Sequence, residues 1–261
     1  MTEAGDVAAG AAPSESVASF TASVEEILAG SPDGLFNAAV DLGDVGVEQA
    51  REVLYRMAAA RGVRDAWLNL AYVVLDSGRT DEGVALLGES ARAGDPKGAF
   101  MYAQELEARG VLDDAARWYA RADGVPGADM RRSRVLRALG HDAEALDVLR
   151  RAAADDAEAA VELVKHDRAL TPDDAVRLLE SHRDAGAVDV LIPLSNLYEE
   201  RGDDDAALSA LQASYDAGEP HAALNLGVLL IRTGREDEGR EYVREAALRG
   251  DELARPWLDE G

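Results

Sequence analysis

Apolar residues recur at steps of three and four along most of the chain, which is the spacing of a helix with one buried face. In the segment that begins at Ala66, the residues Trp67, Leu70, Ala71 and Val74 share one side in this way. The pattern predicts a series of amphipathic helices. It can be followed through seven segments, which begin at Gly34, Ala66, Gly98, Ala128, Ala159, Val190 and Ala222.

Glycines punctuate these segments at a regular interval. One set closes them with separations of 32, 32, 30, 62 and 32 residues: Gly46, Gly78, Gly110, Gly140, Gly202 and Gly234. Thr171 stands where the long gap would otherwise hold a glycine. A second set follows about half a period later: Gly62, Gly94, Gly186, Gly218 and Gly250. Since glycine accepts the left-handed backbone that ends a helix, two interleaved sets predict two helices per repeat.

The second helix of each repeat begins with acidic residues, as in Asp81-Glu82, Asp113-Asp114 and Asp203 to Asp205. Carboxylates at a helix N-terminus can accept hydrogen bonds from free N–H groups and stabilise the helix dipole. The run from Asp203 is not an EF-hand calcium loop, because Leu208 and Ser214 occupy the positions that require Gly and Glu. We therefore interpret these acids as helix-capping residues.

The repeats predict an all-α solenoid of about seven antiparallel helix–turn–helix units over residues 31–250. Residues 15–30 carry one further apolar stripe and are predicted to form an N-terminal capping helix, while residues 251–261 are predicted to form a C-terminal cap. Such caps cover the apolar faces of the terminal repeats. Residues 1–14 are rich in Ala, Gly and Ser and are predicted to be a disordered lead.

Two repeats resemble the tetratricopeptide signature of small or aromatic, Leu, Ala/Gly, aliphatic and turn residues. The matching residues are Trp67, Leu70, Ala71, Val74, Gly78 and Gly83, and then Ala223, Leu226, Gly227, Leu230, Gly234 and Gly239. The phrases ARAGDPKGAFMYA and REAALRGDELA also resemble Sel1-like repeats. The resemblance implies a right-handed superhelix whose concave groove, lined by the first helices, binds peptides or proteins.

Two central repeats depart from this signature, because Arg132 replaces a core Leu and Asp167 replaces an aliphatic residue. We expect the helices there to be shorter or shifted, and the region to be a hinge or a specialised centre.

The groove that the resemblance implies would receive Asp65, Leu68, Asn69, Tyr72, Leu75 and Asp76 from the second repeat. Asn37 and Asn225 occupy the slot of Asn69, and Asn196 occupies that of Tyr72; Gln104 is a further candidate on the third repeat. An amide that both donates and accepts can pair with the backbone of an extended peptide. The alternative is that Asn is simply tolerated on an exposed helical face.

A basic cluster occupies groove slots of the two divergent repeats: Arg131, Arg134, Arg137, Lys165 and Arg168. It could receive a carboxylate, such as a peptide C-terminus or an acidic motif. The alternative is that Asp129, Glu158 and Glu162 neutralise it through ordinary surface pairs.

Composition narrows the function. The chain of 261 residues has no cysteine, which excludes disulfides, thiolate zinc sites and cysteine nucleophiles and fits a reducing cytoplasm. Its formal net charge of −24 argues against nucleic acid and anionic lipid as partners. No signal peptide or membrane-spanning segment is visible. His141, His166, His182 and His221 lack metal-ligand spacing and are expected to be solvated.

These observations predict a cytoplasmic protein-interaction module rather than an enzyme, with no cofactor and no metal. A second hypothesis is that the acidic surface itself masks a basic protein or mimics nucleic acid. An enzyme built around His166 is the weakest of the three, because no nucleophile or phosphate-binding motif accompanies this histidine.

Overall fold

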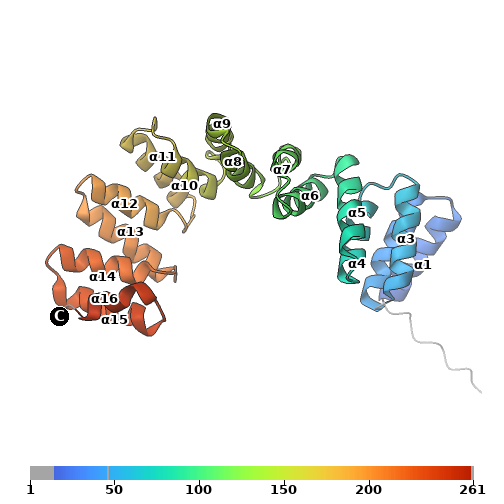
Figure 1. Ribbon diagram of the computed structural model, residues 1–261. Helices are drawn as coiled ribbons and strands as arrows, with labels where there is room; N and C mark the ends of the chain where they lie inside the picture. Colours follow the sequence, from blue (N-terminus) through green and yellow to red (C-terminus); the bar gives the residue numbers. More distant parts are fainter. Residues whose placement is uncertain (1–14, 46, 260–261) are drawn as a thin grey trace, which may run out of the picture. The chain divides into compact units, whose positions relative to one another are not determined.

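The computed structural model describes residues 15–45 and 47–259, and in these ranges every regular element is a helix (Figure 1). The lead predicted over residues 1–14 and the last residues of the predicted C-terminal cap lie outside the described residues. The chain divides into two compact units, residues 1–128 and residues 129–261. Each unit is described by itself.

The first unit contains one lone helix and three helix pairs. Each α-helix packs on the next one along the chain, from α1 to α7. The elements are α1 (Glu15–Leu28), α2 (Pro32–Asp41), the 3₁₀ turn η1 (Leu42–Val45), α3 (Glu48–Ala60), α4 (Ala66–Asp76), α5 (Thr80–Arg92), α6 (Pro96–Ala108) and α7 (Leu112–Tyr119).

The second unit contains four helix pairs and a short terminal segment. From α9 to α15 each helix again packs on the next, and η2 and α16 pack on α15. The elements are α8 (Ala128–Ala138), α9 (Asp142–Ala152), α10 (Ala157–His166), α11 (Pro172–Asp184), α12 (Leu191–Glu200), α13 (Asp204–Asp216), α14 (Ala222–Arg232), α15 (Glu236–Leu248), η2 (Glu252–Ala254) and α16 (Arg255–Asp259). The predicted all-helical repeat fold is confirmed in both units.

The apolar stripe read from the sequence is the buried face of the helices. Leu70, Ala71 and Val74 of α4 are fully buried, and so are Leu226 and Leu230 of α14 to within 2% of their surface. Burial of each large aliphatic side chain contributes about 1.5–3 kcal/mol, so this stripe is the main source of stability of each unit.

The helix-ending glycines have the backbone that their spacing predicts. Gly78 ends α4 with φ of +80° and Gly234 ends α14 with φ of +88°, a region that disfavours side chains with a Cβ. Gly46, which belongs to the same set, lies outside the described residues.

Thr171 does not end a helix, although its place in the period suggested this. It is the N-cap of α11, where its hydroxyl oxygen accepts a hydrogen bond from the Asp174 backbone N–H at 3.1 Å. The turn is made earlier by Asp167, whose carboxylate accepts hydrogen bonds from the Ala169 N–H at 3.0 Å and from Arg150 Nε at 2.9 Å. The side chain of Asp167 therefore replaces the missing glycine.

The first helices of the two divergent repeats have ordinary lengths. Helix α10 has 10 residues, as many as α12, and α8 has 11 residues, as many as α4, so the shortening expected there is wrong. Arg132 is tolerated in the position of a core Leu because its guanidinium reaches Glu144 at 2.7 Å, although its buried Nε has no hydrogen-bond partner.

The acids at the second helices act in two ways. Asp203 is a true N-cap, since its carboxylate accepts a hydrogen bond from the Ala206 N–H at 3.1 Å. At α5 the N-cap residue is Arg79 without a capping bond, and Asp81 and Glu82 lie in the first turn. The predicted capping bond is thus confirmed at α13 and wrong at α5, where the acids stabilise the helix dipole only.

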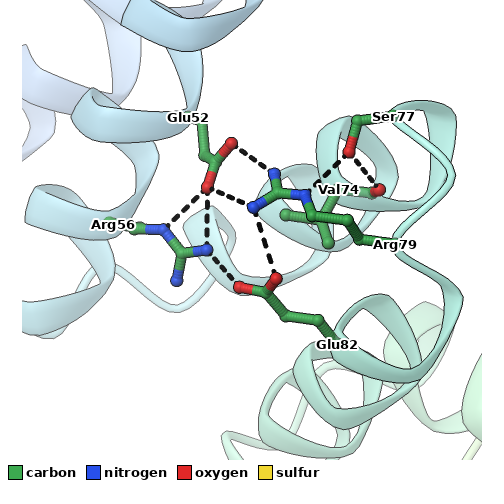
Figure 2. A network of polar contacts seen from close by, with 6 residues as sticks. All are labelled: Glu52, Arg56, Val74, Ser77, Arg79 and Glu82. Atoms are coloured by element: carbon green, nitrogen blue, oxygen red, sulfur yellow. Dashed lines mark hydrogen bonds and ion pairs between the residues drawn. The ribbon is translucent and has the colours of Figure 1, made fainter.

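An ion-pair network joins the first two helix pairs (Figure 2). Glu52 of α3 accepts hydrogen bonds from Arg56, with Nη2 at 2.8 Å from Oε1, and from Arg79, which begins the next pair's second helix. Arg79 also contacts Glu82 at 3.3 Å and Ser77 at 2.9 Å. The bond from Arg79 lowers the pKa of Glu52 below its usual range.

The contact between Arg79 and Glu52 recurs elsewhere in the fold. In the same sense, an Arg at the turn of one helix pair reaches an acid on the second helix of the preceding pair: Arg109 to Asp81 at 3.2 Å and Arg201 to Asp173 at 3.1 Å. Solvent screens such exposed pairs, so each adds little stability. Their recurrence fixes how neighbouring pairs are placed within a unit.

Candidate functional site

A pocket of about 450 Å³ lies at the N-terminal ends of α4 and α6 in the first unit. We call it the α4–α6 pocket. Its walls are Phe36 of α2, residues 64, 65, 68 and 69 at the start of α4, residues 95–97 at the start of α6 and residues 123–125 that follow α7. Four segments that are distant in the sequence thus meet at one place, and its size is within the range of about 300–1,000 Å³ typical of ligand sites.

The start of α6 is fixed by Asp95. One oxygen of its carboxylate accepts a hydrogen bond from the Lys97 backbone N–H at 3.1 Å, and the other accepts one from the Ser90 hydroxyl at 2.8 Å. Pro96 occupies the first helical position, where its missing N–H costs nothing. Both donors are neutral, so the negative charge of Asp95 is held in place without being cancelled.

Tyr72 lies close to this carboxylate. Burial raises the pKa of the Tyr72 phenol, and the negative charge of Asp95 raises it further. The residue is 40% exposed. Tyr72 therefore presents a neutral hydroxyl beside the α4–α6 pocket.

Three of the residues predicted to face the groove lie together in this pocket, namely Asp65, Leu68 and Asn69. Leu75 does not belong with them, because its side chain packs against Gly83 of α5, where a Cβ would lie 2.4 Å from Leu75 Cγ. The prediction for Leu75 is wrong since the position is turned toward the partner helix of its own pair.

Asn37 and Asn69 of the first unit each donate one hydrogen bond within the protein. The Asn69 amide donates to the Asp65 carbonyl oxygen at 2.9 Å, and the Asn37 amide donates to Glu26 Oε2 at 3.0 Å. Each side chain keeps a second N–H and its carbonyl oxygen for other partners. Asn37 does not line the pocket, whereas Asn69 does.

The remaining polar candidates are exposed or half-buried on first helices. Gln104 is half-buried on α6 in the first unit, Asn196 is exposed on α12 and Asn225 is half-buried on α14 in the second unit. Their part in binding stays a prediction.

The basic cluster is less free than its residue types suggest. Lys165 Nζ lies 2.8 Å from Glu162 Oε1, which is the local neutralisation that the sequence offered as the alternative. Arg134 is exposed and its Nη2 lies 3.2 Å from Met130 Sδ, while Arg131 is half-buried and engaged with other residues. Arg137 and Arg168 have no ion-pair partner among the described residues, so the carboxylate site stays a prediction.

The histidines include one that the sequence misplaced. His182 of α11 is 7% exposed, and its Nε2 lies 2.8 Å from the Ala153 carbonyl oxygen, so it is a core residue and not a solvated one. Its spacing from Val176 and Leu179 on the helix was the signal that could have shown this. His221 is exposed, with Nδ1 at 2.7 Å from Asp251 Oδ2.

Two kinds of feature are absent from the part of the chain that the structure describes. Among them, no group of three or more His, Asp or Glu side chains is arranged to hold a metal ion. None of the helices in the described ranges combines the length and the apolar character that crossing a membrane requires.

No protein-family model and no curated protein matches this chain. Solved structures do. A protective antigen present in uropathogenic Escherichia coli strains, which displays a Sel1-like repeat fold, aligns with 93% of the chain at 18% identity and a TM-score of 0.62. The chain spans 59% of the length of that antigen.

Two further structures resemble the chain. A Sel1 repeat protein from Oxalobacter formigenes aligns with 84% of the chain, and with 98% of its own length, at 21% identity and a TM-score of 0.58. The Cut9–Hcn1 hetero-tetramer of the APC/C aligns with 94% of the chain and 52% of its own length at 12% identity and a TM-score of 0.55. The chain thus has the fold of the tetratricopeptide and Sel1-like repeat proteins.

Proposed function

We propose that this protein is an interaction scaffold that holds an extended peptide or a partner helix along the first helices of its repeats. The observation that carries the proposal is the α4–α6 pocket, which gathers Leu68 and Asn69 with side chains from three other segments. A surface that combines apolar walls with a few polar groups is the usual form of a recognition site.

The similar structures support a partner that is itself a protein. One of them is, by its name, a hetero-tetramer of two different proteins, Cut9 and Hcn1. At 12% identity this likeness concerns the fold, so the nature of the partner is our proposal. Folds of this type present long surfaces built from successive repeats, which suits an elongated ligand.

The groups in the pocket favour holding over chemistry. In the pocket, Asn69 offers one free N–H and a carbonyl oxygen to a peptide backbone, and Phe36 and Leu68 offer apolar contact. Tyr72, on the same helix but not among the lining residues, offers its exposed hydroxyl. The residues that line the pocket include no histidine, serine or threonine. We therefore propose binding without catalysis.

The test is a selection of displayed random peptides on the full chain, followed by affinity measurement with the selected synthetic peptides. We expect the double variant Asn69→Ala, Tyr72→Ala to weaken these peptides at least tenfold. Gln49→Ala, an exposed amide on α3 outside the pocket, is the matched control and should change nothing.

Circular dichroism must show that the double variant is still folded. Failure to select any peptide, or equal affinity for wild type and double variant, would contradict the proposal. Selected peptides that bind through charge alone would instead lose affinity steeply with added salt and ignore Asn69→Ala. That result would favour the second hypothesis, in which the acidic surface masks a basic protein.

A further inference from the structure

The charges around the α4–α6 pocket point to the chemistry of the partner. Three carboxylates line it, from Asp65, Asp95 and Asp123, together with the cations of Arg64 and Lys97. Resting on the proposed function, we infer that the bound segment inserts an arginine or lysine side chain into this pocket. The sequence alone suggested the opposite, a partner that bears a carboxylate.

The three carboxylates are not equally available. Asp65 is paired with Arg64, whose Nε lies 3.1 Å from Oδ1. The two donors that bond to Asp95, the Lys97 N–H and the Ser90 hydroxyl, are neutral and bring no compensating charge. Asp123 is exposed and has no ion-pair partner among the described residues. Asp123 is therefore the group that can accept a new charged hydrogen bond, with Asp95 adding attraction at longer range.

The apolar part of the wall suits the stem of such a side chain. Phe36 and Val125 are half-buried and Leu68 is 8% exposed, so these three side chains form an apolar, partly desolvated surface in the pocket. Arginine and lysine bury their methylene groups on apolar surface while the charged head stays near carboxylates and water. A guanidinium close to the Phe36 ring would gain a cation–π contact as well.

The ammonium group of Lys97 distinguishes a cationic ligand from an anionic one. Its side chain is exposed, lines the pocket and has no ion-pair partner among the described residues. A cationic ligand is repelled by this ammonium, whereas an anionic ligand would depend on it. Removing the charge of Lys97 should therefore raise the affinity for a cationic ligand and lower the affinity for an anionic one.

The experiment uses three small probes on the full chain: the N-acetyl methylamides of L-arginine, L-norleucine and L-glutamate. Backbone amide shifts of Asn69 and Lys97 in heteronuclear NMR spectra report binding. We expect saturable shifts with the arginine probe, at least fivefold weaker binding of the norleucine probe, and none of the glutamate probe.

Three variants locate the charge. Asp123→Asn should weaken the arginine probe about two- to fivefold, as expected for one charge at a solvent-exposed site. Lys97→Gln should tighten it by a similar factor. Asp113→Asn removes the same charge from an exposed position in the first turn of α7, outside the pocket, and should leave the affinity unchanged.

The inference is overturned if norleucine binds as well as arginine, or if Asp113→Asn weakens binding as much as Asp123→Asn. It is also overturned if the glutamate probe binds best and Lys97→Gln abolishes that binding. Peptides selected in the earlier test that bind without a basic residue would end this inference and leave the proposed function intact. Saturable binding of the arginine probe, without any selected peptide, would contradict the proposed function and leave the pocket as a site for a basic side chain.

Discussion

Helices α14 and α15 cross so closely that one added methyl group at the crossing should push them apart. A Cβ added at Gly239 would lie 2.5 Å from the Gly227 carbonyl oxygen and 2.9 Å from the Ile231 backbone N. Real Cβ atoms essentially never approach other heavy atoms within 3.0 Å, so Gly239→Ala must move one helix by at least 0.5 Å. Both obstacles are backbone atoms, which cannot rotate away.

The size of the effect follows from two opposing contributions. Overpacking of a well-packed core costs typically about 1–3 kcal/mol, and a backbone obstacle places Gly239 near the upper end. Replacing Gly by Ala inside a helix returns about 1 kcal/mol through helix propensity. We therefore expect Gly239→Ala to lower the free energy of unfolding by about 2 kcal/mol.

The assay is urea denaturation followed by circular dichroism, together with hydrogen exchange of the α14 amides. Gly88→Ala on α5 is the control, because its nearest neighbours are the flexible ends of Arg92 and Tyr102 at 3.3 Å. That variant should be neutral or up to about 1 kcal/mol more stable. Equal stability of Gly239→Ala and wild type would refute the close crossing.

Three further predictions concern the polar contacts. The hydrogen bond from Arg150 holds the pKa of Asp167 below its usual range. The ionised Asp167 therefore contributes its full stabilisation above about pH 4, and this contribution is lost as the pH falls through the lowered pKa of the folded state. Thermal unfolding at pH 6 and pH 3 should therefore show a smaller pH effect in Asp167→Asn than in wild type, and equal effects would contradict this. His182→Ala removes a buried ring and leaves the Ala153 carbonyl without its partner, so urea denaturation should show a loss of about 2–4 kcal/mol; a loss below 1 kcal/mol would mean that the ring is not packed as described. Arg79→Ala should lower the melting temperature slightly in dilute buffer and not in 1 M NaCl, where exposed ion pairs are screened; a loss that persists in salt would show that Arg79 acts through packing.

The repeat architecture could be predicted from the sequence because its determinants are local. Helix faces follow from residues three and four positions apart, and helix ends follow from glycines such as Gly78 that accept a left-handed backbone. The buried positions of Leu70 and Val74 follow from the same spacing. Each of these properties involves one helix and the turn after it.

The candidate site could be predicted only in part from the sequence. Asp65, Leu68 and Asn69 could be placed on one helix face, and the structure brings them to one pocket. The contributions of Phe36 and Asp123 could not be foreseen, because they come from segments about thirty and sixty residues away whose positions depend on how the pairs pack.

What the sequence determined by itself is the list of helices, their buried faces and most of their ends. Only the tertiary structure decided that Leu75 turns toward Gly83 and that Asp167 ends α10 with its side chain. The physical reason is the range of the interactions: helix periodicity is set within one turn of backbone, whereas burial, ion pairing and the shape of a pocket depend on contacts between helices that are distant along the chain.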